Sequence, residues 1–156
     1  MSSNPPIICF KDVYKFYRAG DEQVTALSGI SLEFHQGDFV SIMGPSGGGK
    51  TTFLNCLGGL DLPDKGEIFL NNRLLSNMND KELTELRRKE IGFIFQFFNL
   101  MPTLTIFENV ELPLLISHSA KTQNKQVRAL LDYVGLIHRA KSFPAELSGG
   151  EMQRVA

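Results

Sequence analysis

Apolar residues in the first half of the chain follow the patterns of β-strands. Residues 7–17 (IICFKDVYKFY) are rich in β-branched and aromatic side chains, and Ile30, Leu32 and Phe34 alternate with polar neighbours. The run FVSIM at 39–43 is short and apolar, which is typical of a strand buried on both faces in a parallel sheet. These patterns predict strands over 7–17, 25–34, 39–43, 66–72 and 91–96.

A helical spacing of apolar residues appears once behind residue 50 and then recurs through the second half. Asn79 followed by Glu82 has the form of a capping box, and Gly135 stands where a helix would end. Pro113 is expected to kink the helix that contains it. The pattern predicts helices over 51–60, 79–90, 105–116 and 124–135, and a further one that begins at 148.

The order of these elements indicates an α/β fold. Strands dominate the first half and helices the second, with a helical insertion that opens after Gln96. The length of 156 residues is that of one domain, and 42% hydrophobic with 21% charged residues is a globular composition.

Charge and cysteine content exclude several classes of function. Lys and Arg total 16 and Asp and Glu 17, so the net charge is −1 and no basic surface favours nucleic acid as a partner. Cys9 and Cys56 lie in apolar patterns, away from metal-ligand spacings, and are predicted to be reduced core residues. The N-terminus lacks a signal-peptide pattern, and LPLLI at 112–116 is too short to span a bilayer. A membrane would therefore be reached only through a partner.

The stretch GPSGGGKT at 44–51 matches the phosphate-loop pattern G-x-x-x-x-G-K-[ST]. Glycines let successive N–H groups face one anion, Lys50 adds a charge for the β- and γ-phosphates, and the Thr51 hydroxyl suits Mg²⁺. A glycine-rich turn is the simpler alternative, but the predicted strand before and helix after the loop favour phosphate binding. The dinucleotide pattern G-x-G-x-x-G does not fit the loop. The predicted phosphate-binding residues are Gly44, Pro45, Ser46, Gly47, Gly48, Gly49, Lys50 and Thr51.

Two later stretches narrow the interpretation. FIFQFFNL places Gln96 at the end of a predicted strand, and LSGGEMQRVA closes the chain. The phosphate loop, this glutamine and LSGG, in that order and spacing, resemble the nucleotide-binding domain of ABC transporters over essentially the whole chain. The likeness is greatest to the ATP-binding subunits of the lipoprotein-release and macrolide-export group.

This resemblance implies roles for single residues. Tyr17 matches the aromatic residue on which adenine stacks, although local packing at a strand end is an alternative for it. Thr52 matches the residue that contacts the α-phosphate. Gln96 matches the residue that touches Mg²⁺ or the attacking water and senses the transporter partner, although the residues alone favour a solvated loop glutamine. The resemblance thus implies Thr51 and Gln96 as the Mg²⁺ contacts. ATP and Mg²⁺ are the implied cofactors.

The stretch LSGGE at 147–151 predicts more than a helix start. Ser148 and Glu151 fit the capping box S-x-x-E, but two glycines in a first turn cost helix stability. Bare N–H groups suit a phosphate that must come close. The resemblance implies that this phosphate is held by a second subunit in a head-to-tail dimer. The residues expected to contact it are Leu147, Ser148, Gly149, Gly150 and Glu151.

The chain departs from the family pattern in three places. Gly48 stands where another small residue is common, and Glu151 where glutamine is common. In the family, the Mg²⁺-binding aspartate, the catalytic glutamate and a switch histidine follow LSGG, and the 156 residues end before them. We therefore interpret the chain as a partial nucleotide-binding domain in which the C-terminal part of the core is missing. Its expected parts are a β subdomain with phosphate-loop core (1–95), a helical subdomain with the glutamine loop (96–147) and the start of the signature helix (148–156).

The predicted function is that of an ATP-binding subunit which drives an integral membrane transporter subunit. It would lie at the cytoplasmic face of the inner membrane, bound through that partner. Two alternatives stay open from the sequence: a chain that binds nucleotide without hydrolysing it, and a soluble ABC protein that is not tied to transport.

Overall fold

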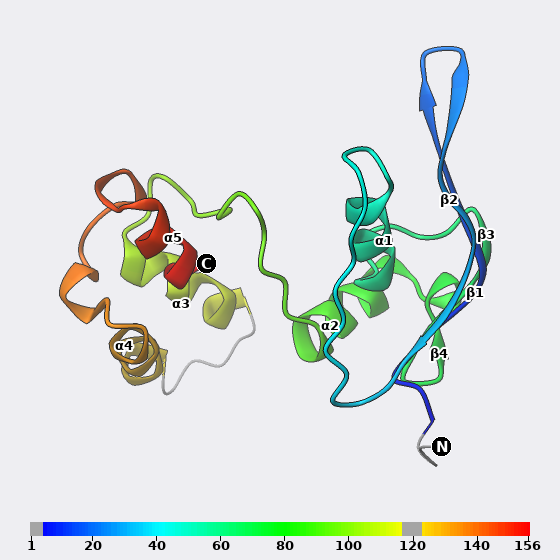
Figure 1. The fold of residues 1–156 in the computed structure, drawn as a ribbon. Helices are drawn as coiled ribbons and strands as arrows, with labels where there is room; N and C mark the ends of the chain where they lie inside the picture. The colour runs from blue at the N-terminus through cyan, green and yellow to red at the C-terminus, as the bar shows by residue number, and fades with distance from the viewer. Residues whose placement is uncertain (1–4, 117–122) are drawn as a thin grey trace. The chain divides into compact units, whose positions relative to one another are not determined.

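The computed structural model describes residues 5–116 and 123–156. The chain divides into two compact units, Met1–Phe93 and Ile94–Ala156, which are described separately below (Figure 1). The first unit carries the phosphate loop, and the second carries Gln96 and the LSGG stretch.

An antiparallel sheet of four strands, in the order β2-β1-β3-β4, forms one layer of the first unit. β1 pairs with β2 along its whole length, whereas its pairing with β3 stops at Tyr14. The far end of the β1–β2 hairpin therefore projects as a two-stranded ribbon (Figure 1). The predicted strands at 7–17, 25–34 and 66–72 are confirmed as β1 (Ile8–Ala19), β2 (Glu22–Phe34) and β3 (Lys65–Leu70), to which the structure adds β4 (Arg73–Leu74).

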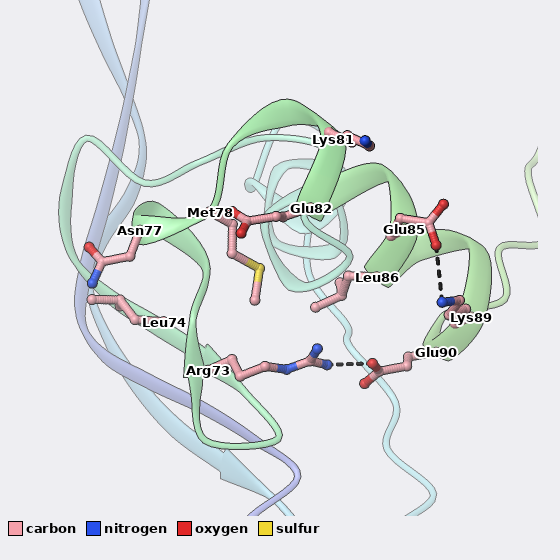
Figure 2. A pocket seen from close by; sticks show the side chains of 10 residues that line it. All are labelled: Arg73, Leu74, Asn77, Met78, Lys81, Glu82, Glu85, Leu86, Lys89 and Glu90. Atoms are coloured by element: carbon pink, nitrogen blue, oxygen red, sulfur yellow. Dashed lines mark hydrogen bonds and ion pairs between the residues drawn. The ribbon is translucent and has the colours of Figure 1, made fainter.

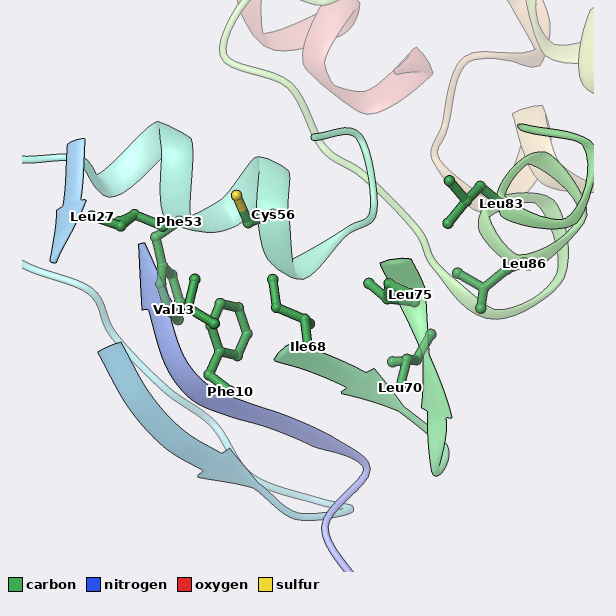
Figure 3. Close-up of a cluster of buried hydrophobic side chains, with 10 residues drawn as sticks. All are labelled: Phe10, Val13, Leu27, Phe53, Cys56, Ile68, Leu70, Leu75, Leu83 and Leu86. Atoms are coloured by element: carbon green, nitrogen blue, oxygen red, sulfur yellow. The ribbon is translucent and has the colours of Figure 1, made fainter. Parts of the chain in front are cut away.

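Helices cover one face of this sheet and bury the core between them (Figure 3). They are α1 (Lys50–Leu57), the 3-10 helix η1 (Leu75–Asn77) and α2 (Asp80–Glu90). The rings of Phe10 and Phe53 stack with centroids 4.8 Å apart, which fastens α1 to β1. The buried residues that form this hydrophobic core are Phe10, Val13, Leu27, Phe53, Cys56, Ile68, Leu70, Leu75, Leu83 and Leu86.

The sequence signal at Asn79 placed the start of α2 correctly, whereas α1 ends at Leu57 and not at residue 60 as predicted. Asn79 accepts hydrogen bonds from the backbone N–H groups of Lys81 and Glu82, and the Glu82 carboxylate accepts from the Asn79 N–H, as the predicted capping box requires. Both cysteines are free and buried, as predicted. Burial raises the pKa of the Cys56 thiol to about 11, so the group stays protonated at neutral pH.

The predicted strands at 39–43 and 91–96 are not formed. Residues 39–43 run as irregular backbone with Phe39 98% and Met43 87% exposed, and Ile94 is 80% exposed in the other segment. Apolar composition alone does not create a strand, because a strand requires a neighbouring strand to pair its N–H and C=O groups. Neither segment pairs with a strand in the described part of the chain.

The second unit is helical. It consists of α3 (Ile106–Ile116), α4 (Gln123–Tyr133), the 3-10 helices η2 (Ile137–Arg139) and η3 (Pro144–Glu146), and α5 (Gly149–Val155). Pro113 lies inside α3 as predicted. The buried residues that form its hydrophobic core are Ile106, Val127, Leu131, Leu136 and Leu147.

The end of α4 shows the predicted role of Gly135. Its φ of 73° lies in the left-handed region, its N–H donates to the Asp132 carbonyl, and the Leu136 N–H donates to the Leu131 carbonyl. This is the Schellman arrangement, which turns the chain so that Leu136 enters the core. No helix in the described ranges combines the length and apolar character that crossing a membrane requires.

Candidate nucleotide-binding site

The phosphate loop leads directly into α1 and is shaped by its glycines. Gly47 and Gly49 both have φ near 78°, a conformation that side chains other than glycine rarely adopt. A Cβ atom on Gly49 would stand 2.3 Å from the Ala26 carbonyl oxygen of β2. Glycine is therefore required at this position both for the turn and for the close approach of the loop to the sheet.

The ammonium group of Lys50 lies against the backbone of the loop. Its Nζ donates to the carbonyl oxygens of Gly44 at 3.0 Å and Pro45 at 2.6 Å, and the Gly48 N–H donates to the same Pro45 oxygen. The loop thus brings an ammonium group and the N-terminus of α1, with its unpaired N–H groups, to one place. This combination suits a polyphosphate anion.

Thr51 and Thr52 lie in the first turn of α1, with Thr51 exposed and Thr52 half-buried. An exposed hydroxyl next to the loop is a suitable ligand for a Mg²⁺ ion that also contacts phosphates. No group of three or more His, Cys, Asp and Glu side chains within residues 5–116 and 123–156 could hold a metal by itself. The Thr51 hydroxyl fits a magnesium ion that arrives with a nucleotide.

Tyr17 lies on the projecting ribbon and is 41% exposed. Its hydroxyl donates to Oδ2 of Asp61 at 2.7 Å, and Thr52 lies next to it. Desolvation and the hydrogen bond to Asp61 raise the pKa of Tyr17, which keeps the phenol neutral. The structure thus brings together Tyr17 and Thr52, two residues that the sequence placed at the nucleotide.

Sequence reasoning missed Lys15 and Asp61. Lys15 is only 9% exposed, and its Nζ lies 2.7 Å from Oδ1 of Asp61. Burial lowers the pKa of Lys15, but the pairing with Asp61 outweighs it and raises this pKa. Burial likewise raises the pKa of Asp61, but the contacts with Lys15 and Tyr17 outweigh it and lower this pKa. A signal was available, because Lys15 follows the core residue Val13 at strand spacing, and an inward lysine needs a partner.

A hollow of about 560 Å³ between β4 and α2 is the other conspicuous feature of this unit (Figure 2). Its charges neutralise one another: Arg73 pairs with Glu90, and Lys89 pairs with Glu85 at 3.1 Å. Paired surface charges offer little to a charged ligand. The phosphate loop is therefore the better candidate site.

The second unit holds Gln96 and the LSGG stretch. Gln96 is exposed on irregular backbone. Leu147 is 8% exposed and belongs to the core of the unit, so it anchors the stretch and is less open to a ligand than the sequence implied. Ser148 caps α5: its N–H donates to Glu151 at 2.8 Å, and its hydroxyl accepts from the Glu151 N–H at 3.3 Å. The predicted capping box is confirmed.

The two glycines of the stretch are accessible to an approaching group. A Cβ on Gly150 would have no heavy atom within 4 Å, and one on Gly149 would meet only Phe98, at 3.9 Å. Neither glycine is thus required by local packing.

Hydrogen bonds from the N–H and hydroxyl of Ser148 lower the pKa of Glu151, whose carboxylate also lies 3.5 Å from Arg139 Nε.

Comparison with known proteins agrees with this geometry. The family model described as ABC transporter matches residues 27–156. The lipoprotein-releasing system ATP-binding protein LolD of Saccharophagus degradans is 49% identical over 155 residues, which are 99% of this chain and 68% of LolD. The macrolide export ATP-binding/permease protein MacB of Bdellovibrio bacteriovorus is 48% identical over 96% of this chain and 23% of MacB.

A solved structure is also similar. The dimeric, post-hydrolysis form of the ATP-binding cassette MJ0796, bound to ADP and Pi, superposes with a TM-score of 0.86 at 44% identity, over 95% of this chain and 66% of MJ0796. The chain thus spans about two thirds of the length of LolD and of MJ0796. With a phosphate loop of the expected shape and a family match over 27–156, this chain belongs to the ABC transporter family, in which its relatives LolD and MacB are ATP-binding proteins.

Proposed function

We propose that the chain binds MgATP through residues 44–52 as part of the ATP-binding subunit of an ABC transporter. The observation that carries this proposal is the position of Lys50. Its ammonium is held by the Gly44 and Pro45 carbonyl oxygens at the mouth of a loop that opens onto the N-terminus of α1. A phosphate group entering there would replace two neutral acceptors by a charged one, which strengthens the hydrogen bonds.

The remaining contacts follow the order of the nucleotide. Tyr17 offers an exposed ring face for adenine, and Thr52 beside it is assigned to the α-phosphate. Thr51 would hold Mg²⁺, which would neutralise charge on the β- and γ-phosphates. Gln96 is assigned to Mg²⁺ or to the water that attacks the γ-phosphate, and the hydrolysis of ATP is proposed for the whole subunit.

We further propose that two such subunits pair head to tail. Residues 147–151 of one would cover the γ-phosphate held by the other. The open space around Gly149 and Gly150 supports this assignment, since N–H groups can approach a phosphate only where no side chain intervenes. MJ0796, to which the chain is similar, was solved as a dimer.

The likeness to LolD and MacB supports a role in moving a lipoprotein or a drug-like molecule. In this proposal an integral membrane subunit selects the substrate, and the ATP-binding subunit lies against it at the cytoplasmic face of the inner membrane. The division into a β subdomain with phosphate-loop core (1–95), a helical subdomain (96–147) and the signature helix (148–156) belongs to the same proposal. Nucleic acid has no part in it.

Titration calorimetry of the chain with MgATP tests the central claim. We expect saturable binding of one ATP per chain, with competition by tripolyphosphate because the loop recognises phosphate. A chain that is folded by circular dichroism and binds neither compound would refute the proposal.

Replacing Ser148 by arginine tests the head-to-tail pairing. We expect the variant to bind MgATP with unchanged affinity but to lose ATP-dependent association, because the added side chain would occupy the space above the glycines. Sedimentation velocity with a non-hydrolysable ATP analogue measures the association.

The matched control is Ala145→Arg, which adds the same side chain at an exposed position three residues earlier. It should associate like the wild type. ATP-dependent association by the Ser148 variant at the level of this control would contradict the assignment.

A further inference from the structure

The buried lysine of the β1–β2 hairpin connects the nucleotide site to the segment behind α1. Lys15 Nζ donates to the Leu62 carbonyl oxygen at 2.7 Å and lies 2.7 Å from Asp61 Oδ1 and 3.8 Å from Asp64 Oδ2. All three acceptors come from residues 61–64, which follow the end of α1. Burying an ammonium is costly, so this set of partners is what holds Lys15 inward.

The two carboxylate oxygens of Asp61 have different partners. Oδ1 lies 2.7 Å from Lys15 Nζ and accepts a hydrogen bond from the backbone N–H of Leu62 at 2.9 Å. Oδ2 accepts from the Tyr17 hydroxyl at 2.7 Å. Asp61 is therefore fixed in orientation by one oxygen and holds the tyrosine with the other.

The Tyr17 side chain is consequently fixed at its hydroxyl, while part of the residue remains exposed to solvent. Lys15 Nζ lies 5.6 Å from the ring centroid, while 41% of the residue stays exposed to solvent. Two further hydrogen bonds reinforce the arrangement, because the Phe16 N–H donates to the Asp64 carboxylate and the Asp64 N–H donates to the Tyr14 carbonyl. Without these contacts, an exposed ring on a two-stranded ribbon would populate several rotamers.

We propose that Lys15 and Asp61 are positioning residues for the nucleotide base: the pair holds the Tyr17 ring, through its hydroxyl, in the orientation that adenine meets. This inference rests on the proposed binding of ATP at the phosphate loop. An aromatic ring that is already ordered loses less conformational entropy when a base stacks on it. The hydroxyl of Tyr17 thus contributes to base binding without touching the nucleotide.

Tyr17→Phe tests the proposal, because it keeps the aromatic face and removes the hydroxyl that donates to Asp61. The affinities of the chain for MgATP and for tripolyphosphate are measured side by side. We expect ATP binding to weaken by about two- to tenfold, the equivalent of one side chain that must be ordered on binding. Tripolyphosphate binding should be unchanged, since the phosphate loop is intact.

Asp61→Ala is the second variant. Alanine has no side-chain acceptor, so neither Lys15 nor Tyr17 keeps its partner at this position. The same selective loss of ATP affinity is expected. Tyr14→Phe is the matched control, since it removes a hydroxyl from the same strand without a contact to Asp61 and should leave both affinities unchanged.

The outcomes separate this inference from the proposed function. Unchanged ATP affinity in Tyr17→Phe would overturn the positioning role while ATP binding stood. An equal loss for ATP and tripolyphosphate would also overturn it, because a general structural effect would then explain the result. A wild-type chain that binds neither compound would overturn both.

Discussion

Replacing Lys50 by alanine is expected to weaken MgATP binding by about 10- to 100-fold, the usual worth of a hydrogen bond to a charged group. Lys50 is the only cation of the loop sequence 44–51, and its Nζ lies within 3.0 Å of two loop carbonyl oxygens. An alanine there removes the charge that, in the proposed site, would meet the β- and γ-phosphates. Titration calorimetry on the folded variant measures the loss.

Lys81→Ala is the matched control for this change. Lys81 is exposed in the first turn of α2 and has no assigned part in nucleotide binding. Its replacement removes the same charge and should leave ATP affinity within about twofold, as expected for a distant surface charge. Near-wild-type affinity in the Lys50 variant would show that phosphate is not bound at this loop.

The second large effect concerns the apolar residues between β2 and the phosphate loop. Phe39 and Met43 are almost fully exposed, and Val40 and Ile42 line a hollow of about 400 Å³ beside Leu27. Exposed apolar residues on a backbone that pairs with no strand favour association with other chains. We expect the chain to self-associate at micromolar concentration and the double variant Phe39→Ser/Met43→Ser to be largely monomeric.

Sedimentation equilibrium and thermal unfolding decide this prediction together. The double variant should keep the melting temperature of the wild type, because it removes no buried surface. Phe10→Ser is the contrasting control: Phe10 is 1% exposed and stacks on Phe53, so its loss should cost about 3–5 kcal/mol of stability. If the double variant is destabilised as much as Phe10→Ser, residues 39–43 are buried in solution, as their sequence suggests.

Local rules recovered most of the individual elements. The strands of the hairpin, the capped start of α2 at Asn79, the end of α4 at Gly135 and the capping box at Ser148 all follow from residues within one or two turns of each other. The same holds for the phosphate loop, whose glycines and lysine lie within eight consecutive residues. These features need no distant contact to be specified.

The sequence by itself therefore determined the hairpin, the helices and the glycine-rich loop that leads into α1. The tertiary structure alone decided that 39–43 and 91–96 do not form strands, because pairing depends on a neighbour that no local pattern reveals. It also decided that Tyr17 is held by Asp61, 44 residues away, and that Lys15 is buried beside it. A side chain's partner across the fold is set by how elements pack, whereas the elements themselves are set by periodicity and capping.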